Sequence, residues 1–372
     1  MGKSDRKLTE ENSIENGVKP GKLTEEEMDA IDNSSQSKIV AIASMAKRLG
    51  LGLGSDLSQV EYPSSFIAPF STLNFFSNNF ANHFNILLRA NKIENEMDRL
   101  IEVFKYSTTI HKIPEDCMKV PLNAVIGETQ SLNFQTPDLN SPNDLISDNY
   151  LITEQVSELP PNTATCIYNK KEGVKALFNH ESKIVFQITN VKTPTTGRKY
   201  VRFDKFDEEY DIEFPVLHSR FMRGFVEYCG EGSIKSNKSK CFVSTNYIAK
   251  PLIGGNYHAY EAKVYNGIDS KPIYKISGQW DGESKITNLK TNETKPFFKN
   301  ITTTTNFTPT ILNTDSSVVW GKIIQSVAQG KPINLAREKS KIIENQKTLN
   351  WAPSQFFLNL EMGVWEPKLL ND

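Results

Sequence analysis

Three patterns of apolar and polar residues follow one another along the chain. Residues 71–112 carry apolar side chains at three-to-four spacing, which is typical of buried helix faces. Between about residues 150 and 280, short runs rich in β-branched and aromatic residues alternate with turn clusters, which predicts strands. Helical spacing returns after Trp320 and continues through Lys347. Repeated strands without intervening helices predict an antiparallel sheet or barrel, so we expect a mainly β protein with flanking helices, of the α+β class.

Residues 1–36 form a polar, charged segment that we expect to be mobile. One local helix is predicted within this segment. Thr24 and Glu27 have the spacing of a capping box, and Leu23 and Met28 have that of the matching hydrophobic staple.

An amphipathic helix is predicted next, over residues 38–49. The Gly50–Gly54 stretch then ends this helix and supplies a hinge. Such a helix either packs on the core or lies against a bilayer surface. Its apolar positions are Ile39, Ile42, Met45, Ala46 and Leu49.

Composition excludes several classes of protein. With 372 residues, the chain is long enough for one large domain or two ordinary ones. A formal net charge of −1 argues against a general nucleic-acid binder. No run of eighteen apolar residues occurs, and the N-terminus lacks an apolar signal core. We therefore expect a soluble, intracellular protein.

The cysteines and histidines match no common catalytic or metal-binding motif. The four cysteines show no CxxC pairing, which favours reduced thiols in the cytosol. The five histidines lack HExxH spacing, and neither a GxSxG elbow nor a P-loop is present. The sequence predicts neither an enzyme nor a metal or cofactor site. These residues are Cys117, Cys166, Cys229, Cys241, His83, His111, His180, His218 and His258.

One octapeptide is far more specific. Residues 154–161 read Glu-Gln-Val-Ser-Glu-Leu-Pro-Pro and resemble, at six of eight positions, the Glu-Gln-Val-Ser-His-His-Pro-Pro signature of the oxysterol-binding protein family. Glu158 and Leu159 stand where the family has its two histidines. The matching positions are Glu154, Gln155, Val156, Ser157, Pro160 and Pro161.

Three further blocks resemble the same family in the expected order. Residues 121–128 are similar to its Pro-Leu-Asn-Pro-x-Leu-Gly-Glu block, and residues 278–283 to its Gly-x-Trp-Asp-Gly-Glu strand end. Residues 338–347 resemble its C-terminal Glu-Lys-Ser helix. The resemblance implies a large incomplete antiparallel β-barrel around a lipid tunnel, formed by residues 37–372. It also implies C-terminal helices and a lid at about residues 38–50.

In this family, a phosphoinositide head group is held at the rim of the tunnel. Carried over position by position, Asn123 and Lys339 are retained, and Lys347 replaces an arginine. The lysine of the Lys-Pro-Leu-Asn block is displaced by one residue, to Lys119. Residues 339, 343 and 347 are four apart, so they share one helix face.

The loss of both histidines predicts weaker phosphoinositide binding. Two charge-assisted hydrogen bonds, each worth about 1.5–3 kcal/mol, are missing. The Glu158 carboxylate would add repulsion of roughly 3 kcal/mol about 5 Å from a phosphate. Together these effects correspond to roughly a thousandfold or more in affinity. The alternative is that Lys119, Lys339 and Lys347 compensate.

The resemblance implies a cytoplasmic carrier of a sterol or glycerophospholipid, in transient peripheral contact with membranes. The alternative is a lipid sensor or scaffold that binds lipid without net transfer. No protein partner is indicated by the sequence, and no nucleic acid is expected.

Overall fold

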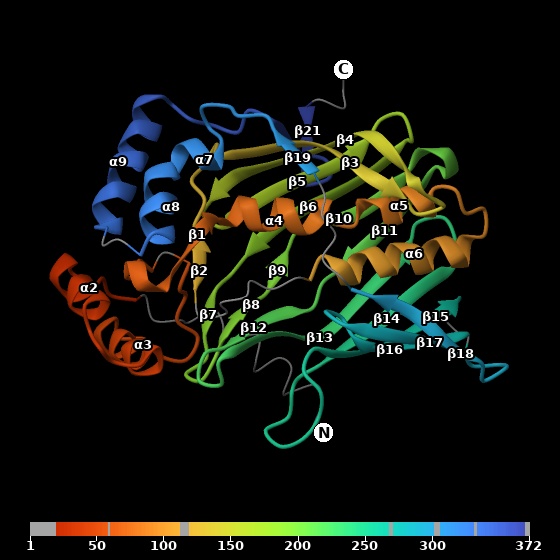
Figure 1. The fold of residues 1–372 in the computed structure, drawn as a ribbon, viewed down its shortest axis with the longest axis horizontal. Helices are drawn as coiled ribbons and strands as arrows, with labels where there is room; N and C mark the ends of the chain where they lie inside the picture. The colour runs from red at the N-terminus through yellow and green to blue at the C-terminus, as the bar shows by residue number, and fades with distance from the viewer. Residues whose placement is uncertain are drawn as a thin grey trace.

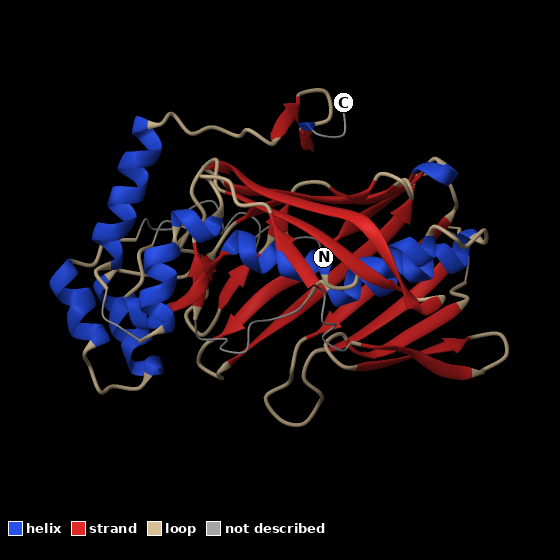
Figure 2. Ribbon diagram, turned by 45° about the horizontal axis from the view of Figure 1, so that its top comes forward, coloured by secondary structure: helices blue, strands red, loops and turns tan. Residues whose placement is uncertain are grey.

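The computed structural model describes residues 20–58, 60–111, 119–267, 271–300, 306–330 and 333–368. A 17-stranded antiparallel sheet dominates this part of the chain and curls into an incomplete barrel (Figures 1 and 2). The prediction of a mainly β fold with flanking helices is confirmed. The longer strands are β3 (Thr129–Asp138), β4 (Ser141–Glu158), β5 (Pro161–Asn169), β6 (Val174–Ser182), β10 (Lys199–Phe203), β11 (Glu208–Glu213), β13 (Phe225–Ser236), β14 (Cys241–Ile248), β15 (Ala259–Asn266), β16 (Tyr274–Gln279), β17 (Glu283–Asn288) and β18 (Thr294–Lys299).

Alternation of side chains builds the wall of the barrel. In β14 every second residue from Cys241 to Tyr247 is buried, while Ser244 and Asn246 face solvent. This period of two matches the pleat of a strand that is covered on one face only. The β14 residues pair one to one with β15, from Cys241↔Asn266 to Ile248↔Ala259.

Short strands complete the sheet. β8 pairs with both β7 and β12, and β12 pairs with β13, so these strands form a ladder that joins the rest of the sheet at β13. The short strands are β7 (Val185–Phe186), β8 (Val191–Thr193), β9 (Thr195–Thr196), β12 (Val216–Arg220) and β19 (Asn306–Pro309). Two small sheets lie outside, β1 (Ile67–Ser71) with β2 (Val120–Leu122) and β20 (Phe356–Asn359) with β21 (Val364–Pro367).

Helices α4 (Thr72–Ala81), α5 (Phe84–Ala90) and α6 (Glu96–Thr109) lie across the concave side of the sheet (Figure 1). Their apolar residues form the largest core together with inward-facing strand residues. Phe80 stacks on Phe178 of β6 with ring centroids 4.3 Å apart. The side chains of these helices therefore fill one part of the barrel interior. This confirms the buried helix faces predicted for residues 71–112.

The other helices gather at one end of the barrel (Figures 1 and 2). They include the predicted amphipathic helix, which the structure confirms as α3. They are α2 (Glu25–Asp32), α3 (Lys38–Arg48), α7 (Ser316–Val319), α8 (Gly321–Ala328) and α9 (Leu335–Thr348); single turns of 3₁₀ helix occur at Ser64–Phe66 and Asp204–Phe206.

Part of the polar segment predicted over residues 1–36 forms helix α2 and packs on the rest of the chain. The capping box of Thr24 and Glu27 is formed, and it starts α2 as expected. Leu23 and Met28 are buried in one cluster with residues of α3. The Asp32 carboxylate also accepts hydrogen bonds from Ser64. Helix α2 is thus held against α3 because Leu23 and Met28 pack on apolar residues of that helix. Residues 1–19 lie outside the described part of the chain.

Candidate ligand-binding site

A cavity of about 540 Å³ lies between α3, α4, α9 and the strands on this side of the barrel. Its volume falls within the range of about 300–1,000 Å³ that is usual for small-molecule sites. Most of its wall is apolar, with side chains such as Phe66, Phe76 and Phe214. The space is therefore suited to a largely apolar guest.

Helix α3 covers this cavity. Ile42, Met45 and Leu49 line it, whereas Ile39 is 39% exposed and is not among the lining residues. The Ser37 side chain caps the start of the helix, and Gly50 follows its end with a φ of 64°, which favours glycine. Four of the five apolar positions predicted for this helix thus line the cavity, since Ala46 does so as well.

Helix α2 holds α3 from outside. Leu23 and Met28 join Met45 and Leu49 in one buried cluster. Arg48 of α3 also forms a 2.8 Å ion pair with Glu27 of α2. The helix predicted as a lid is therefore backed by a second helix.

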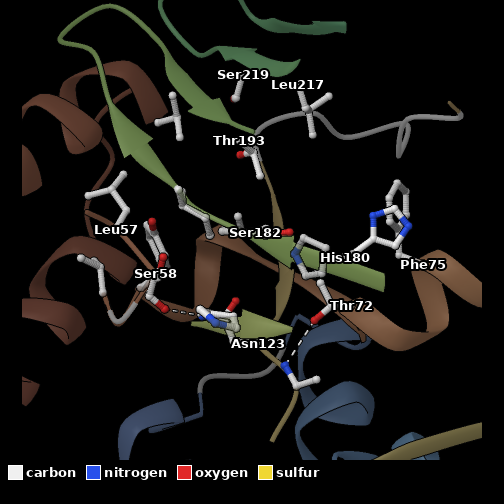
Figure 3. Close-up of a pocket in the computed structure, with 18 of the residues that line it drawn as sticks. Leu57, Ser58, Thr72, Phe75, Asn123, His180, Ser182, Thr193, Leu217 and Ser219 are labelled. Atoms are coloured by element: carbon white, nitrogen blue, oxygen red, sulfur yellow. Dashed lines mark hydrogen bonds between the residues drawn. The ribbon is translucent and has the colours of Figure 1, made fainter. Parts of the chain in front are cut away.

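The structure brings together most residues of the predicted head-group rim. Lys119, Asn123, Glu158, Lys339 and Lys347 all line the cavity, although they come from separate segments of the chain. Ile343 lines it as well, which confirms that residues 339, 343 and 347 share one face of α9. Asn123 donates a 3.3 Å hydrogen bond to the Ser58 carbonyl (Figure 3).

Leu159 is the exception among these rim positions. Its side chain is 76% exposed, and it does not belong to the residues that line the cavity. Glu158 is the last residue of β4, whereas Leu159 lies in the turn that follows the strand. Only Glu158 of the two substituted positions therefore faces the cavity.

The rim carries charges that lack protein partners. The ammonium groups of Lys119, Lys339 and Lys347 form no ion pair or hydrogen bond with any other described residue, and neither does the Glu158 carboxylate. Three cations against one anion leave a net positive rim. An acidic head group would meet attraction from the lysines and repulsion from Glu158.

The signature residues divide into two roles. Glu154 is buried and points away from the cavity, where it accepts hydrogen bonds from the backbone N–H groups of Ser354, Gln355 and Phe356. Burial raises the pKa of this carboxyl group, although the three N–H donors oppose that rise. Val156 is buried in the adjacent core cluster.

The remaining signature residues shape the wall. Gln155 lines the cavity, and its amide is fixed because Nε2 donates to the Ser157 carbonyl and Oε1 accepts from Thr163, both at 2.7 Å. Pro161 also lines the cavity, whereas Pro160 is exposed.

Sequence reasoning missed the most unusual lining residue, His180 on β6. Its side chain is almost fully buried, yet neither ring nitrogen has a hydrogen-bond partner among the described residues. The ring stacks on Phe76, with centroids 4.8 Å apart. Figure 3 shows His180 on the cavity wall, across from Leu217 and Ser219.

Burial, together with the charge of Lys199, holds the pKa of His180 well below its ordinary value. The ring is therefore neutral near pH 7, with one nitrogen as a donor and the other as an acceptor. A buried polar group without a partner is costly, so this imidazole would gain from a hydrogen bond to a guest that reached it.

Lys199 lies behind this part of the wall and is itself buried. Its Nζ donates to the carbonyls of Thr196 and Gly197, both at 2.9 Å. Burial lowers the pKa of Lys199 to about 8. The neighbourhood of His180 therefore disfavours positive charge.

The described residues show neither a metal-binding cluster nor a membrane-spanning helix. They contain no group of three or more His, Cys, Asp or Glu side chains placed to hold a metal ion. Within the same ranges, no helix has the length and apolar character needed to cross a bilayer.

Solved structures share this fold. The structure superposes on the ORD domain of Osh1 in complex with cholesterol with a TM-score of 0.69, covering 91% of this chain and 87% of that one at 16% identity. The ORD of Osh3 from Saccharomyces cerevisiae, in complex with PI(4)P, gives a TM-score of 0.66 at 16% identity, covering 88% and 89% of the two chains.

Sequence comparison gives closer relatives. Oxysterol-binding protein 1 of Dictyostelium discoideum is 38% identical, with all of both chains covered. Oxysterol-binding protein 5 of the same organism is 37% identical over 88% of this chain and 93% of the relative. The family model for oxysterol-binding proteins matches residues 44–355. The chain therefore belongs to the oxysterol-binding protein family.

Proposed function

We propose that this protein carries one sterol or glycerophospholipid molecule at a time between membranes, through the cytoplasm. The observation that carries the proposal is the apolar cavity of about 540 Å³ beneath α3. Burying a few hundred Å² of hydrocarbon there stabilises the complex by several kcal/mol, at roughly 25 cal/mol per Å². Structural neighbours that hold cholesterol, ergosterol or PI(4)P support a lipid cargo.

The cavity wall at His180 favours a cargo that carries a polar group at the end lying inside the cavity. The His180 nitrogens are the buried polar atoms of the cavity wall that lack a described partner, apart from groups at the rim. A hydroxyl group can both donate to and accept from a neutral imidazole. A sterol entering with its hydroxyl group first satisfies this requirement, which makes it the better fit of the two cargo classes.

Phosphoinositide binding is weakened in this proposal but not abolished. Glu158 places at the head-group rim a carboxylate that has no ion-pair partner among the described residues, and the family's histidine pair is absent. Lys119, Lys339 and Lys347 supply positive charge, but ammonium groups lack the bidentate geometry of arginine. Exchange driven by a phosphoinositide is therefore weak, and the cargo gradient itself supplies the direction of transfer.

The proposed activity involves no chemical conversion of the cargo. Lipid transfer between donor and acceptor liposomes tests it, with fluorescent sterol as the cargo. A carrier moves many lipids per protein molecule, whereas a sensor or scaffold stops once each protein is loaded. The matched control is Leu217→Trp, which places an indole in the cavity and should abolish transfer. Transfer that stops at about one lipid molecule per protein molecule favours the sensor or scaffold instead.

A further inference from the structure

Five aliphatic side chains are exposed on four loops near the lid. They are unusual because each stands at the tip of a loop rather than on the flank of an element. Leu252 and Ile253, between β14 and β15, are 88% and 92% exposed, which is close to full exposure. The other three are Leu53 after α3, Ile188 between β7 and β8, and Met222 between β12 and β13.

Strand pairing and hydrogen bonds join these four loops into one surface. Gly54 donates to the Phe186 carbonyl, which places the loop after α3 beside the β7–β8 turn. β8 pairs with β12, so the β7–β8 and β12–β13 turns belong to one ladder. Arg223 donates to the carbonyls of Lys250 and Pro251, both at 2.9 Å, and so fixes the base of the 249–257 loop. Figure 1 shows these loops along the lower edge of the molecule.

The backbone conformation of Ile188 indicates that the exposed side chains on these four loops serve a function. Its φ of 60° is left-handed, a conformation that a β-branched residue rarely adopts. A solvent-facing turn would be more stable with glycine or asparagine at this position. Instead, a strained residue presents an aliphatic side chain that is 62% exposed.

The charges of the rim favour an anionic surface. The tips at 50–54, 187–190, 221–224 and 250–257 contain no aspartate or glutamate. They contain two cations, Arg223 and Lys250, and one half-exposed tyrosine, Tyr257. Aliphatic side chains flanked by cations and a tyrosine are typical of the interfacial region of a bilayer.

We propose that these four tips, here named the docking rim, insert into the surface of a bilayer that contains anionic lipid. The rim borders the cavity, since Phe186 and Phe221 at its base line that cavity and belong to the same buried cluster as α3. Four separate protruding tips suit a deformable surface, whereas protein interfaces are built around packed aromatic and arginine anchors. This inference extends the proposed carrier function by giving the orientation in which the lid meets the membrane.

Vesicle flotation of the full chain tests the docking rim. The probe is phosphatidylcholine vesicles containing phosphatidylserine, without sterol. We expect wild type to float, and the double variant Leu252→Asp, Ile253→Asp to partition at least about tenfold more weakly. The matched control is Leu360→Asp, because Leu360 is 84% exposed on the β20–β21 turn, outside the rim.

Each outcome decides the inference. Equal flotation of the double variant and wild type would overturn it, as would an equal loss in Leu360→Asp. Failure of wild type to float would also overturn it, and the exposed side chains of the docking rim would then be assigned to contact with a protein. A second measurement compares Ile253→Trp with Leu360→Trp, and only the former should gain quenching by brominated phosphatidylcholine.

The cavity variant separates this inference from the carrier function. Leu217→Trp should float like wild type but fail to transfer sterol. Normal transfer by Leu217→Trp would contradict the carrier proposal, while normal flotation by the double variant would contradict only the docking rim.

Discussion

The backbone N–H of Phe356 donates a 3.0 Å hydrogen bond to Oε2 of Glu154, a residue 202 positions earlier in the chain. The same carboxylate also binds the N–H groups of Ser354 and Gln355. The first residue of the family signature therefore ties the segment after α9 to the barrel. This role explains why the signature extends beyond the residues that face the cavity.

Replacing Glu154 should lower stability without altering the rim. Glu154→Ala leaves three backbone N–H groups without their acceptor, at a cost of roughly 3 kcal/mol or more. Glu154→Gln keeps one acceptor oxygen and should cost less. Urea unfolding measures both, with the exposed Glu361→Ala as a control. An unchanged midpoint for Glu154→Ala would show that the segment is held by other contacts.

His180→Phe should separate hydrogen bonding from packing in the cavity. Phenylalanine keeps the stack on Phe76 but removes both nitrogens. Affinity for cholesterol should fall about tenfold, in line with the loss of one hydrogen bond, while affinity for cholestane stays the same. The free energy of unfolding should be unchanged or higher, because an unpartnered polar group is removed. An equal loss for both ligands would assign His180 a packing role only.

Glu158→Gln should strengthen phosphoinositide binding. Removing the carboxylate charge relieves repulsion at the rim, and we expect roughly a tenfold or greater gain in affinity at low salt. Leu159→Gln is the matched control, since that side chain is exposed and does not line the cavity. Extraction of a monophosphorylated phosphoinositide from liposomes measures both variants. A gain in Leu159→Gln alone would contradict the placement of these residues.

Lys199 should make stability depend on pH. Its folded pKa of about 8 lies below the ordinary value of 10.5, because the ammonium group is buried. Between these values the unfolded chain binds a proton that the folded chain does not, so stability rises as pH increases. Lys199→Met should reduce this rise by up to roughly 3 kcal/mol. Urea unfolding at pH 8 and above, compared with wild type, measures the difference.

Local spacing made some features predictable. The capping box at Thr24 and the apolar face of α3 involve residues within a few positions of each other, and both formed as expected. The four-residue spacing of positions 339, 343 and 347 likewise placed all three at the cavity. Each of these relationships depends on one helix alone.

Relationships across the barrel were not predictable in the same way. His180 reaches the cavity because β6 pairs with β5 in a register that sets it opposite Thr163. A shift of one residue would turn it outward, and nothing in the local sequence fixes that register. The packing of α2 was missed for a similar reason, since Leu23 and Met28 need an apolar surface supplied by α3 and the loops beyond it.

The packing of α2 against α3 bears on how long the proposed carrier would keep its cargo. If α3 opens as a lid in the proposed carrier, Leu23 and Met28 must separate from Met45 and Leu49 or move with them, whereas the exposed Glu27–Arg48 pair adds little resistance. The Asp32 carboxylate accepts hydrogen bonds from Ser64, so α2 would turn about this end of the helix if it moved with α3. In the proposed carrier, the dwell time of a loaded molecule would then depend on two apolar contacts outside the cavity as well as on the affinity of the cavity for its guest.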